Sequence, residues 1–180
     1  MRIIAGKHRG RKLAEFSVGG IRPTADRVKE CLFNILSVRV AGANVLDLFC
    51  GSGSLGLESL SRGAEYAHFN DISRESLSVL KKNIAAVREG DRCTVTNLNF
   101  TDCLKATDKK YDIIFIDPPY AEEFGRAALE IISARGLLTE DGVAVYERDR
   151  TFDGGVAGLE KTDERKYGKT YLTFFMREKI

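Results

Sequence analysis

The chain has 180 residues, 43% of them hydrophobic, which is enough for one domain with a substantial core. No apolar run approaches the length of a membrane span, and the first residues lack the apolar stretch of a signal peptide. Two histidines, and four cysteines without a C-x-x-C pair, give no support for a metal site. We therefore expect a cytoplasmic protein without a metal or a membrane, whose cysteines are reduced core residues: Cys31, Cys50, Cys93 and Cys103.

The net charge is only +2, but the charges are unevenly distributed along the chain. Residues 1–40 contain nine Lys or Arg and three Asp or Glu, whereas residues 41–180 contain nineteen and twenty-three. This pattern predicts a basic N-terminal extension (1–40) on a larger body (41–180), and it suits a polyanionic partner. Residues 2–13 could form a short strand pair that turns at Gly6 and Gly10 and displays basic side chains to phosphates; the alternative is a solvated, poorly ordered terminus.

A helix is expected after Arg22-Pro23-Thr24, with Thr24 as its N-cap and Asp26 in its first turn. Most of this helix would be scaffold. Its apolar stripe is formed by Val28, Leu32, Ile35 and Leu36. Charged residues are expected on another face of the helix: Arg27, Lys29 and Glu30.

The most informative stretch begins with a short apolar run, Val45–Cys50, which is expected to be a buried strand. Gly51, Gly53 and Gly56 follow it in the spacing G-x-G-x-x-G, and a helical pattern begins behind them. Such a turn lets the backbone approach a ligand closely and directs the helix N-terminus at an anionic group. Asp71 follows at about the distance expected of a ribose-binding acid, so the motif predicts a nucleotide-like ligand.

The rest of the chain alternates strands with helices, which predicts an α/β fold with a mainly parallel sheet and helices on both faces. Strands are expected over residues 66–69, 93–98, 111–117 and 142–146, helices over 54–62, 73–90 and 122–134, and a closing antiparallel pair over 160–167 and 170–177. Ligands bind at the carboxyl ends of the strands in such sheets. Four acids fall at these ends and are expected to converge there: Asp47, Asp71, Asp102 and Asp117.

One of these acids opens the tetrapeptide Asp117-Pro118-Pro119-Tyr120, which suits methylation of a planar amino nitrogen. The lone pair of such a nitrogen is delocalised, so the nitrogen is a poor nucleophile until its two hydrogens are held. The Asp117 carboxylate and a backbone carbonyl can accept hydrogen bonds from these two hydrogens. The prolines stiffen the backbone, and Tyr120 can stack on a base. With S-adenosylmethionine as the ligand, Asp71 could accept from the ribose hydroxyls and Asp102 from the adenine amino group, while Asp47 could favour the positive charges.

Residues 47–56 resemble the first motif of class I S-adenosylmethionine-dependent methyltransferases, and residues 117–120 resemble their amino-methylating motif. Residues 2–13, 22–24 and 27–34 are similar to the front of the RsmD family, whose members methylate the N2 amino group of a guanine in bacterial 16S ribosomal RNA. The resemblance covers nearly the whole chain.

The resemblance implies a Rossmann-like fold with a seven-stranded, mainly parallel sheet, a C-terminal antiparallel pair and a small N-terminal hairpin and helix. It implies S-adenosylmethionine as the cofactor and 16S rRNA, in the small ribosomal subunit or its assembly intermediate, as the partner. The implied catalytic residues are Asp117, Pro118, Pro119 and Tyr120. The implied cofactor site contains Asp47, Phe49, Gly51, Gly53, Gly56, Asp71, Ile72 and Asp102. The implied RNA-facing residues are Lys7, Arg9, Arg11, Lys12, Arg22, Thr24 and Arg27.

Several alternatives stay open at this point. The same tetrapeptide serves enzymes that methylate adenine N6 or cytosine N4, and related enzymes act on DNA or on protein amides, although 180 residues leave no room for a separate target-recognition domain. A nicotinamide-dependent dehydrogenase would share the glycine pattern but would not need residues 117–120. A non-catalytic RNA-binding module would explain the basic terminus but not the converging acids. Nothing demands a dimer, so we expect a monomer.

Overall fold

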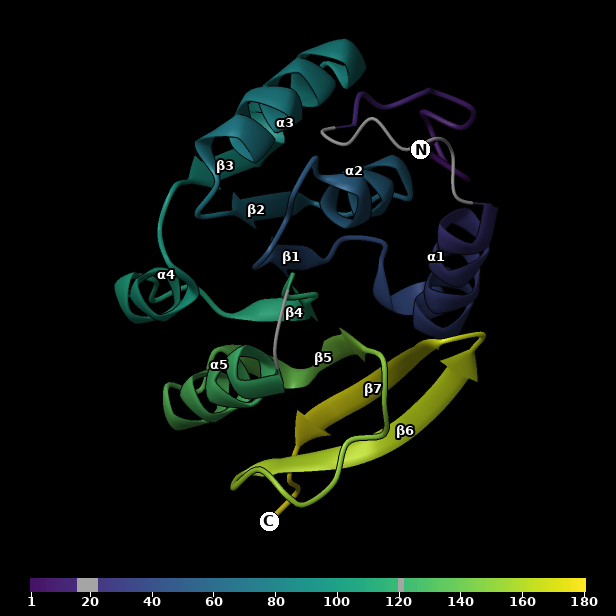
Figure 1. The fold of residues 1–180 in the computed structure, drawn as a ribbon. Helices are drawn as coiled ribbons and strands as arrows, with labels where there is room; N and C mark the ends of the chain where they lie inside the picture. The colour runs from purple at the N-terminus through teal and green to yellow at the C-terminus, as the bar shows by residue number, and fades with distance from the viewer. Residues whose placement is uncertain (16–22, 120–121) are drawn as a thin grey trace.

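A computed structural model describes residues 1–15, 23–119 and 122–180, and it contains one seven-stranded sheet in the order β3-β2-β1-β4-β5-β7-β6 (Figure 1). The strands are β1 (Asn44–Asp47), β2 (Tyr66–Asn70), β3 (Cys93–Thr96), β4 (Tyr111–Ile116), β5 (Leu138–Arg148), β6 (Leu159–Tyr167) and β7 (Thr170–Arg177). The helices are α1 (Pro23–Leu36), α2 (Ser54–Ser61), α3 (Arg74–Val87), α4 (Phe100–Ala106) and α5 (Glu122–Ala134), with short 3-10 helices η1 (Ser37–Arg39) and η2 (Gly90–Arg92).

The first five strands are parallel, and β7 lies antiparallel between β5 and β6. From β1 the chain moves outward to β3 and then crosses back to β4, on the other side of β1. The order of the strands therefore reverses between β1 and β4, which is where ligands bind in open α/β sheets. This topology confirms the expected fold and brings the ends of β1 and β4 side by side.

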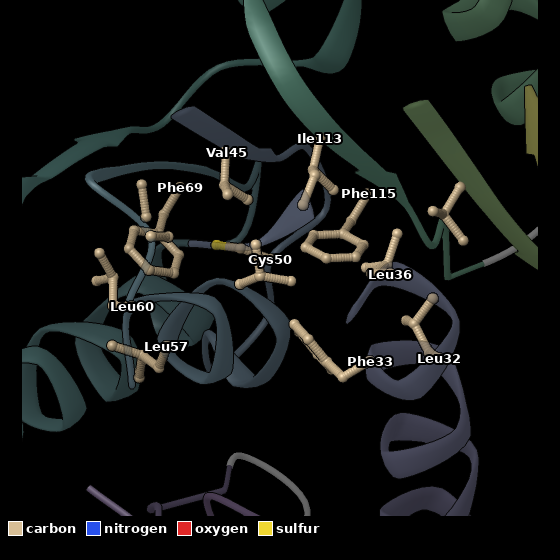
Figure 2. Packing of buried hydrophobic residues seen from close by; sticks show 14 of the residues in the cluster. Leu32, Phe33, Leu36, Val45, Cys50, Leu57, Leu60, Phe69, Ile113 and Phe115 are labelled. Atoms are coloured by element: carbon tan, nitrogen blue, oxygen red, sulfur yellow. The ribbon is translucent and has the colours of Figure 1, made fainter. Parts of the chain in front are cut away.

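Two apolar cores cover the two faces of the sheet. Helices α1, α2 and α3 supply the first core, and α4 and α5 supply the second. Figure 2 shows Phe33 and Leu36 of α1 directed at Phe115 of β4, and the Phe33 and Phe115 ring centroids are 5.9 Å apart. Each such fully buried side chain contributes about 1.5–3 kcal/mol to folding. The N-terminal extension joins the first core through Ile3 and Leu13, which are also buried.

The strand pair expected over residues 2–13 is reduced to a single antiparallel bridge between Arg2 and Lys12. The reason lies in helix α2. The Ala5 N–H, which would continue the pairing beyond the Ile3 N–H to Arg11 O bond, donates instead to the Glu58 carboxylate at 3.1 Å, and the Ile4 N–H donates to the same carboxylate at 2.9 Å. The terminus is nevertheless held against the body through these bonds.

Several element boundaries also differ from expectation. Helix α1 begins at Pro23, whose fixed φ suits a first helical position, so Thr24 lies inside the helix and is not its N-cap. Strand β5 is longer than expected because it pairs with both β4 and β7. All four cysteines are free, but only Cys50 and Cys103 are buried, whereas the other two are half-buried.

Candidate functional site

The turn between β1 and α2 shows why its glycines are required. Gly51 and Gly53 have φ angles of 53° and 90°, a region that favours glycine. A Cβ at Gly51 would meet no protein atom within 4 Å, which leaves space for a ligand to approach the backbone. A Cβ at Gly56 would lie 2.3 Å from Cε1 of Phe69, so this third glycine allows α2 to pack on the sheet. The first glycine therefore serves ligand approach and the third serves packing.

Asp47 ends β1 directly beneath this turn and is only 2% exposed. Its Oδ2 accepts a hydrogen bond from the Gly56 N–H at 3.1 Å. Burial, with smaller effects from the negative charges of Asp117 and Asp71, raises the pKa of Asp47 to about 7, although the Gly56 bond opposes this rise. A positive group of a ligand beside Asp47 would restore the charged form, so this carboxyl suits a cationic ligand.

Asp71 follows β2 and links the glycine turn to the start of α3. Its Oδ2 accepts from the Gly51 N–H, and its Oδ1 accepts from the Ser73 N–H, both at 2.8 Å. Ser73 is the expected N-cap of α3, and its hydroxyl accepts from the Ser76 N–H at 3.2 Å. The carboxylate of Asp71 is thus held at the mouth of the turn, where a ribose can reach it.

A cavity of about 270 Å³, here called the aromatic cavity, opens beside Asp71. The Phe100 ring centroid lies 5.5 Å from that of Phe49 and 5.3 Å from that of Phe124. Ile72 also lines the cavity, and its 71% exposed side chain is unusual for an isoleucine. These apolar walls, with Asp71 at one edge, suit a planar heterocycle attached to a ribose.

A second cavity of about 470 Å³, here called the basic cavity, lies on the other side of the Asp117-Pro118-Pro119 segment. Pro119 lines both cavities, so the two adjoin. The basic cavity is named after its three cations, Arg148, Arg150 and Lys169. It also contains three acids: Asp117, Glu147 and Asp149. Its charges suit a polar and partly anionic ligand, in contrast to the aromatic cavity.

Asp117 and Glu147 both line the basic cavity. Asp117 keeps exposed surface, yet its carboxyl is crowded by protein atoms. This crowding, together with the charge of Glu147, raises the pKa of Asp117 well above its usual range. Burial also raises the pKa of Glu147. The sequence analysis did not find Glu147, because one Glu at the end of a strand belongs to no recognisable motif.

The chain matches the family model described as "Conserved hypothetical protein 95" over residues 1–176. It belongs to this family. YlbH of Bacillus subtilis (strain 168) is 35% identical over 98% of this chain and 99% of its own length. The Escherichia coli (strain K12) protein named Ribosomal RNA small subunit methyltransferase D is 37% identical over 83% of this chain and 75% of its own. The solved structure of yhhF from Escherichia coli superposes with a TM-score of 0.88 at 34% identity, covering 99% of this chain and 98% of that one.

The resemblance to the RsmD family is thereby confirmed, and the fold is that of the class I methyltransferases. Asp102, expected just beyond the end of the third strand, follows β3 in the next helix, and its role in binding the cofactor stays a prediction. It lies in the first turn of α4, and its Oδ2 accepts from Nδ2 of the N-cap residue Asn99 at 2.7 Å. Among the described lining residues of the aromatic cavity are Asn99, Phe100 and Thr101, but not Asp102. The helix-start pattern Asn-x-x-Asp was the signal available in the sequence for this placement.

The expected RNA-facing residues of this family member are partly visible. Lys7, Arg9, Arg11 and Lys12 are all exposed on the N-terminal extension, and so is Arg27 on α1. Arg22 and Tyr120 lie outside the described residues, as does the side chain of Thr24. The structure therefore presents a basic, exposed surface on the extension.

Lys29 was expected on a face of α1 away from its apolar stripe, and it is only 4% exposed. Its Nζ lies 3.3 Å from Oε2 of Glu58, which is fully buried, and donates to Oγ of Ser54 at 3.1 Å. It also donates to the backbone oxygen of Arg2 at 2.6 Å. Burial lowers the pKa of Lys29, although Glu58 opposes this shift. Lys29 therefore ties α1, the N-terminal extension and the start of α2 together.

In the three described segments, no group of three or more His, Cys, Asp or Glu could hold a metal ion. A helix both long enough and apolar enough to cross a membrane is also absent from these segments.

Proposed function

We propose that this chain transfers a methyl group from S-adenosylmethionine to the N2 amino group of one guanine in 16S rRNA of the small ribosomal subunit. The observation that carries this proposal is the place of the Asp117-Pro118-Pro119 segment, which lines the basic cavity and reaches the adjoining aromatic cavity through Pro119. One cavity suits a nucleoside and the other suits part of a nucleic acid. The name of the Escherichia coli relative supports ribosomal RNA as the substrate class.

The residues of the aromatic cavity fit the cofactor. Phe49, Ile72 and Phe100 provide apolar surfaces for an adenine ring, and the Asp71 carboxylate lies where the ribose hydroxyls would donate. The open space at Gly51 accommodates the methionyl part, and the buried Asp47 favours its positive charges. When bound, S-adenosylmethionine supplies an electrophilic methyl group on a positively charged sulfur.

The chain itself would prepare the target nitrogen. The Asp117 carboxylate and the Pro118 carbonyl oxygen would each accept a hydrogen bond from the amino group. These two hydrogen bonds would direct the lone pair of the nitrogen toward the cofactor. The Asp117 carboxyl must be ionised so that either of its oxygens can accept a hydrogen bond from the amino group. A cationic ligand nearby would lower the pKa of Asp117 from its raised value in the free protein. Proline at position 118 has no N–H that could compete for the amino group.

The exposed basic residues of the N-terminal extension and the cations of the basic cavity would contact RNA phosphates. The substrate would be the small subunit or an assembly intermediate, which places the reaction in the cytoplasm. The predicted monomer and the division into residues 1–40 and 41–180 remain predictions.

The test is methyl transfer from labelled S-adenosylmethionine to small subunits from cells that lack this gene, followed by nucleoside analysis. We expect N2-methylguanosine at one site. Asp117→Ala should reduce transfer by about 100-fold or more while leaving S-adenosylhomocysteine binding intact. Asp108→Ala, at a nearly fully exposed acid that pairs with Arg135, is the matched control and should remain active.

Two other results would contradict the proposal. Labelled methyladenosine would keep the chemistry but change the target base. Thermal stabilisation by NAD and not by S-adenosylhomocysteine would favour a dehydrogenase.

A further inference from the structure

We infer that Glu147 selects guanine over adenine and cytosine, by accepting a hydrogen bond from the guanine N1–H that lies beside the target amino group. This inference rests on the proposed function, since it concerns the base that enters the site next to Asp117. It assigns a specificity role to a residue that no sequence motif marks.

The sheet places the two carboxyl groups together. Ile116 of β4 pairs with Tyr146 of β5 in a parallel register. The next residues along the chain are Asp117, directly after β4, and Glu147, near the end of β5, so the two lie at the same level of the sheet. Both line the basic cavity, and both also line a smaller cavity of about 270 Å³ between α1 and the start of α2. Any base that presents its amino group to Asp117 therefore lies next to Glu147.

The three bases with an exocyclic amino group differ at the neighbouring ring atom. In guanine the amino group lies beside N1–H, which is a donor. In adenine it lies beside N1, and in cytosine beside N3, and both of these carry a lone pair. Asp117 and the Pro118 carbonyl can accept hydrogen bonds from the amino group of any of the three bases. These two acceptors therefore do not discriminate among the bases. A second acceptor at the neighbouring position pairs with guanine and faces a lone pair in the other two.

The energetic consequence is large, because an unpaired acceptor facing a lone pair loses a hydrogen bond and meets repulsion. Sites built to bind an N–H or O–H of the substrate reject analogues that lack it by about 10⁴-fold in favourable cases. The pKa shifts agree with this arrangement, because burial raises the pKa of both carboxyls and the charge of Glu147 raises that of Asp117 further. The adjacent donors N1–H and N2–H of guanine would each pair with one of these two carboxylates and favour its charged form.

The test replaces the target guanine by 2-aminopurine in 16S rRNA that is ligated and reconstituted into small subunits. This base keeps the 2-amino group but has a lone pair at N1. For the wild type we expect kcat/KM to fall by about 100-fold or more on 2-aminopurine. Glu147→Gln should shrink this ratio at least tenfold, mainly through a gain on 2-aminopurine, because the glutamine amide can donate to N1. The loss of the guanine O6 is common to both enzymes and cancels in the double comparison.

Two further variants complete the experiment. Glu140→Gln makes the same chemical change at an exposed position of the same strand and should keep the wild-type ratio. Glu147→Asp keeps a carboxylate with shorter reach, so it should keep the preference for guanine with a lower kcat/KM. Thermal unfolding and S-adenosylhomocysteine binding show whether each variant is folded.

An equal loss on guanine and 2-aminopurine for Glu147→Gln would overturn the inference, because Glu147 would then only support Asp117. In that case the wild type still methylates guanine, and the proposed function stands. A wild type that methylates neither RNA would reject the proposed function and remove the inference with it.

Discussion

Replacing Asp47 by Asn would separate the stability of the glycine turn from its function. The two side chains have nearly the same shape, and the Asn Oδ1 can still accept from the Gly56 N–H, which is 3.1 Å from Asp47 Oδ2. What the substitution removes is the ionisation of a carboxyl that is 2% exposed. We expect Asp47→Asn to be more stable than the wild type above neutral pH and to bind the cofactor less tightly.

The size of the stability effect follows from the pKa. Folding raises the pKa of Asp47 from 3.8 to about 7, mainly through burial. A shift of about 3 units at 1.36 kcal/mol per unit corresponds to about 4 kcal/mol, as an upper estimate. The folded protein keeps this proton up to about pH 7, whereas the unfolded chain releases it near pH 4. Wild-type stability therefore falls as the pH rises from about 4 to about 7 and beyond. The Asn variant has no carboxyl at this position, so it does not lose this stability.

Urea unfolding of both proteins at pH 6 and pH 8 measures this difference. The variant should be more stable by on the order of 2–4 kcal/mol at pH 8, and the gap should widen by about 1 kcal/mol between the two pH values. Calorimetry with S-adenosylhomocysteine should show at least tenfold weaker binding, because the charge that favours the ligand's ammonium group is gone. Equal stabilities at pH 8, or a gap independent of pH, would refute the reasoning.

Three further substitutions test other parts of the structure. Gly56→Ala would place its Cβ 2.3 Å from Cε1 of Phe69, so thermal unfolding should show a loss of about 1–3 kcal/mol, and an unchanged stability would mean that α2 can shift freely. Lys29→Met leaves the fully buried Glu58 without one of its cations; urea unfolding should show a loss of about 3 kcal/mol, and a loss below about 1 kcal/mol would contradict the pairing. Arg9→Glu, on the exposed extension, should leave the Tm unchanged but weaken RNA binding and reduce its salt slope by about 1, whereas an unchanged slope would exclude a phosphate contact.

Local features of the chain were predictable from the sequence because they depend on neighbours along the backbone. The strand-turn-helix around residues 45–61 needs only an apolar run, glycines that permit positive φ, and helical spacing behind them. The Ser73 cap of α3 is likewise a contact within three residues. The parallel sheet followed from the alternation of strands and helices, and its order brought Asp47 and Asp117 to one edge.

Contacts between distant segments were not predictable in this way. The helical pattern placed Lys29 away from the apolar stripe of α1, and only the approach of α2 to α1 places it beside Glu58. The Ala5 N–H donates to that same carboxylate and so does not continue the expected hairpin beyond its one bridge.

The sequence by itself determined the α/β fold, the glycine turn and the Asp117–Tyr120 tetrapeptide, since each depends on residues that are close together along the chain. Only the tertiary structure decided which side chains stand next to them. Asn99 and Phe100 line the aromatic cavity, while the Asp102 carboxylate accepts a hydrogen bond from the side chain of Asn99, the N-cap of α4. Glu147 stands beside Asp117 because β4 and β5 pair in one register, a relation between residues thirty positions apart. Burial and charge at that point depend on both strands at once, so no single stretch of sequence carries them.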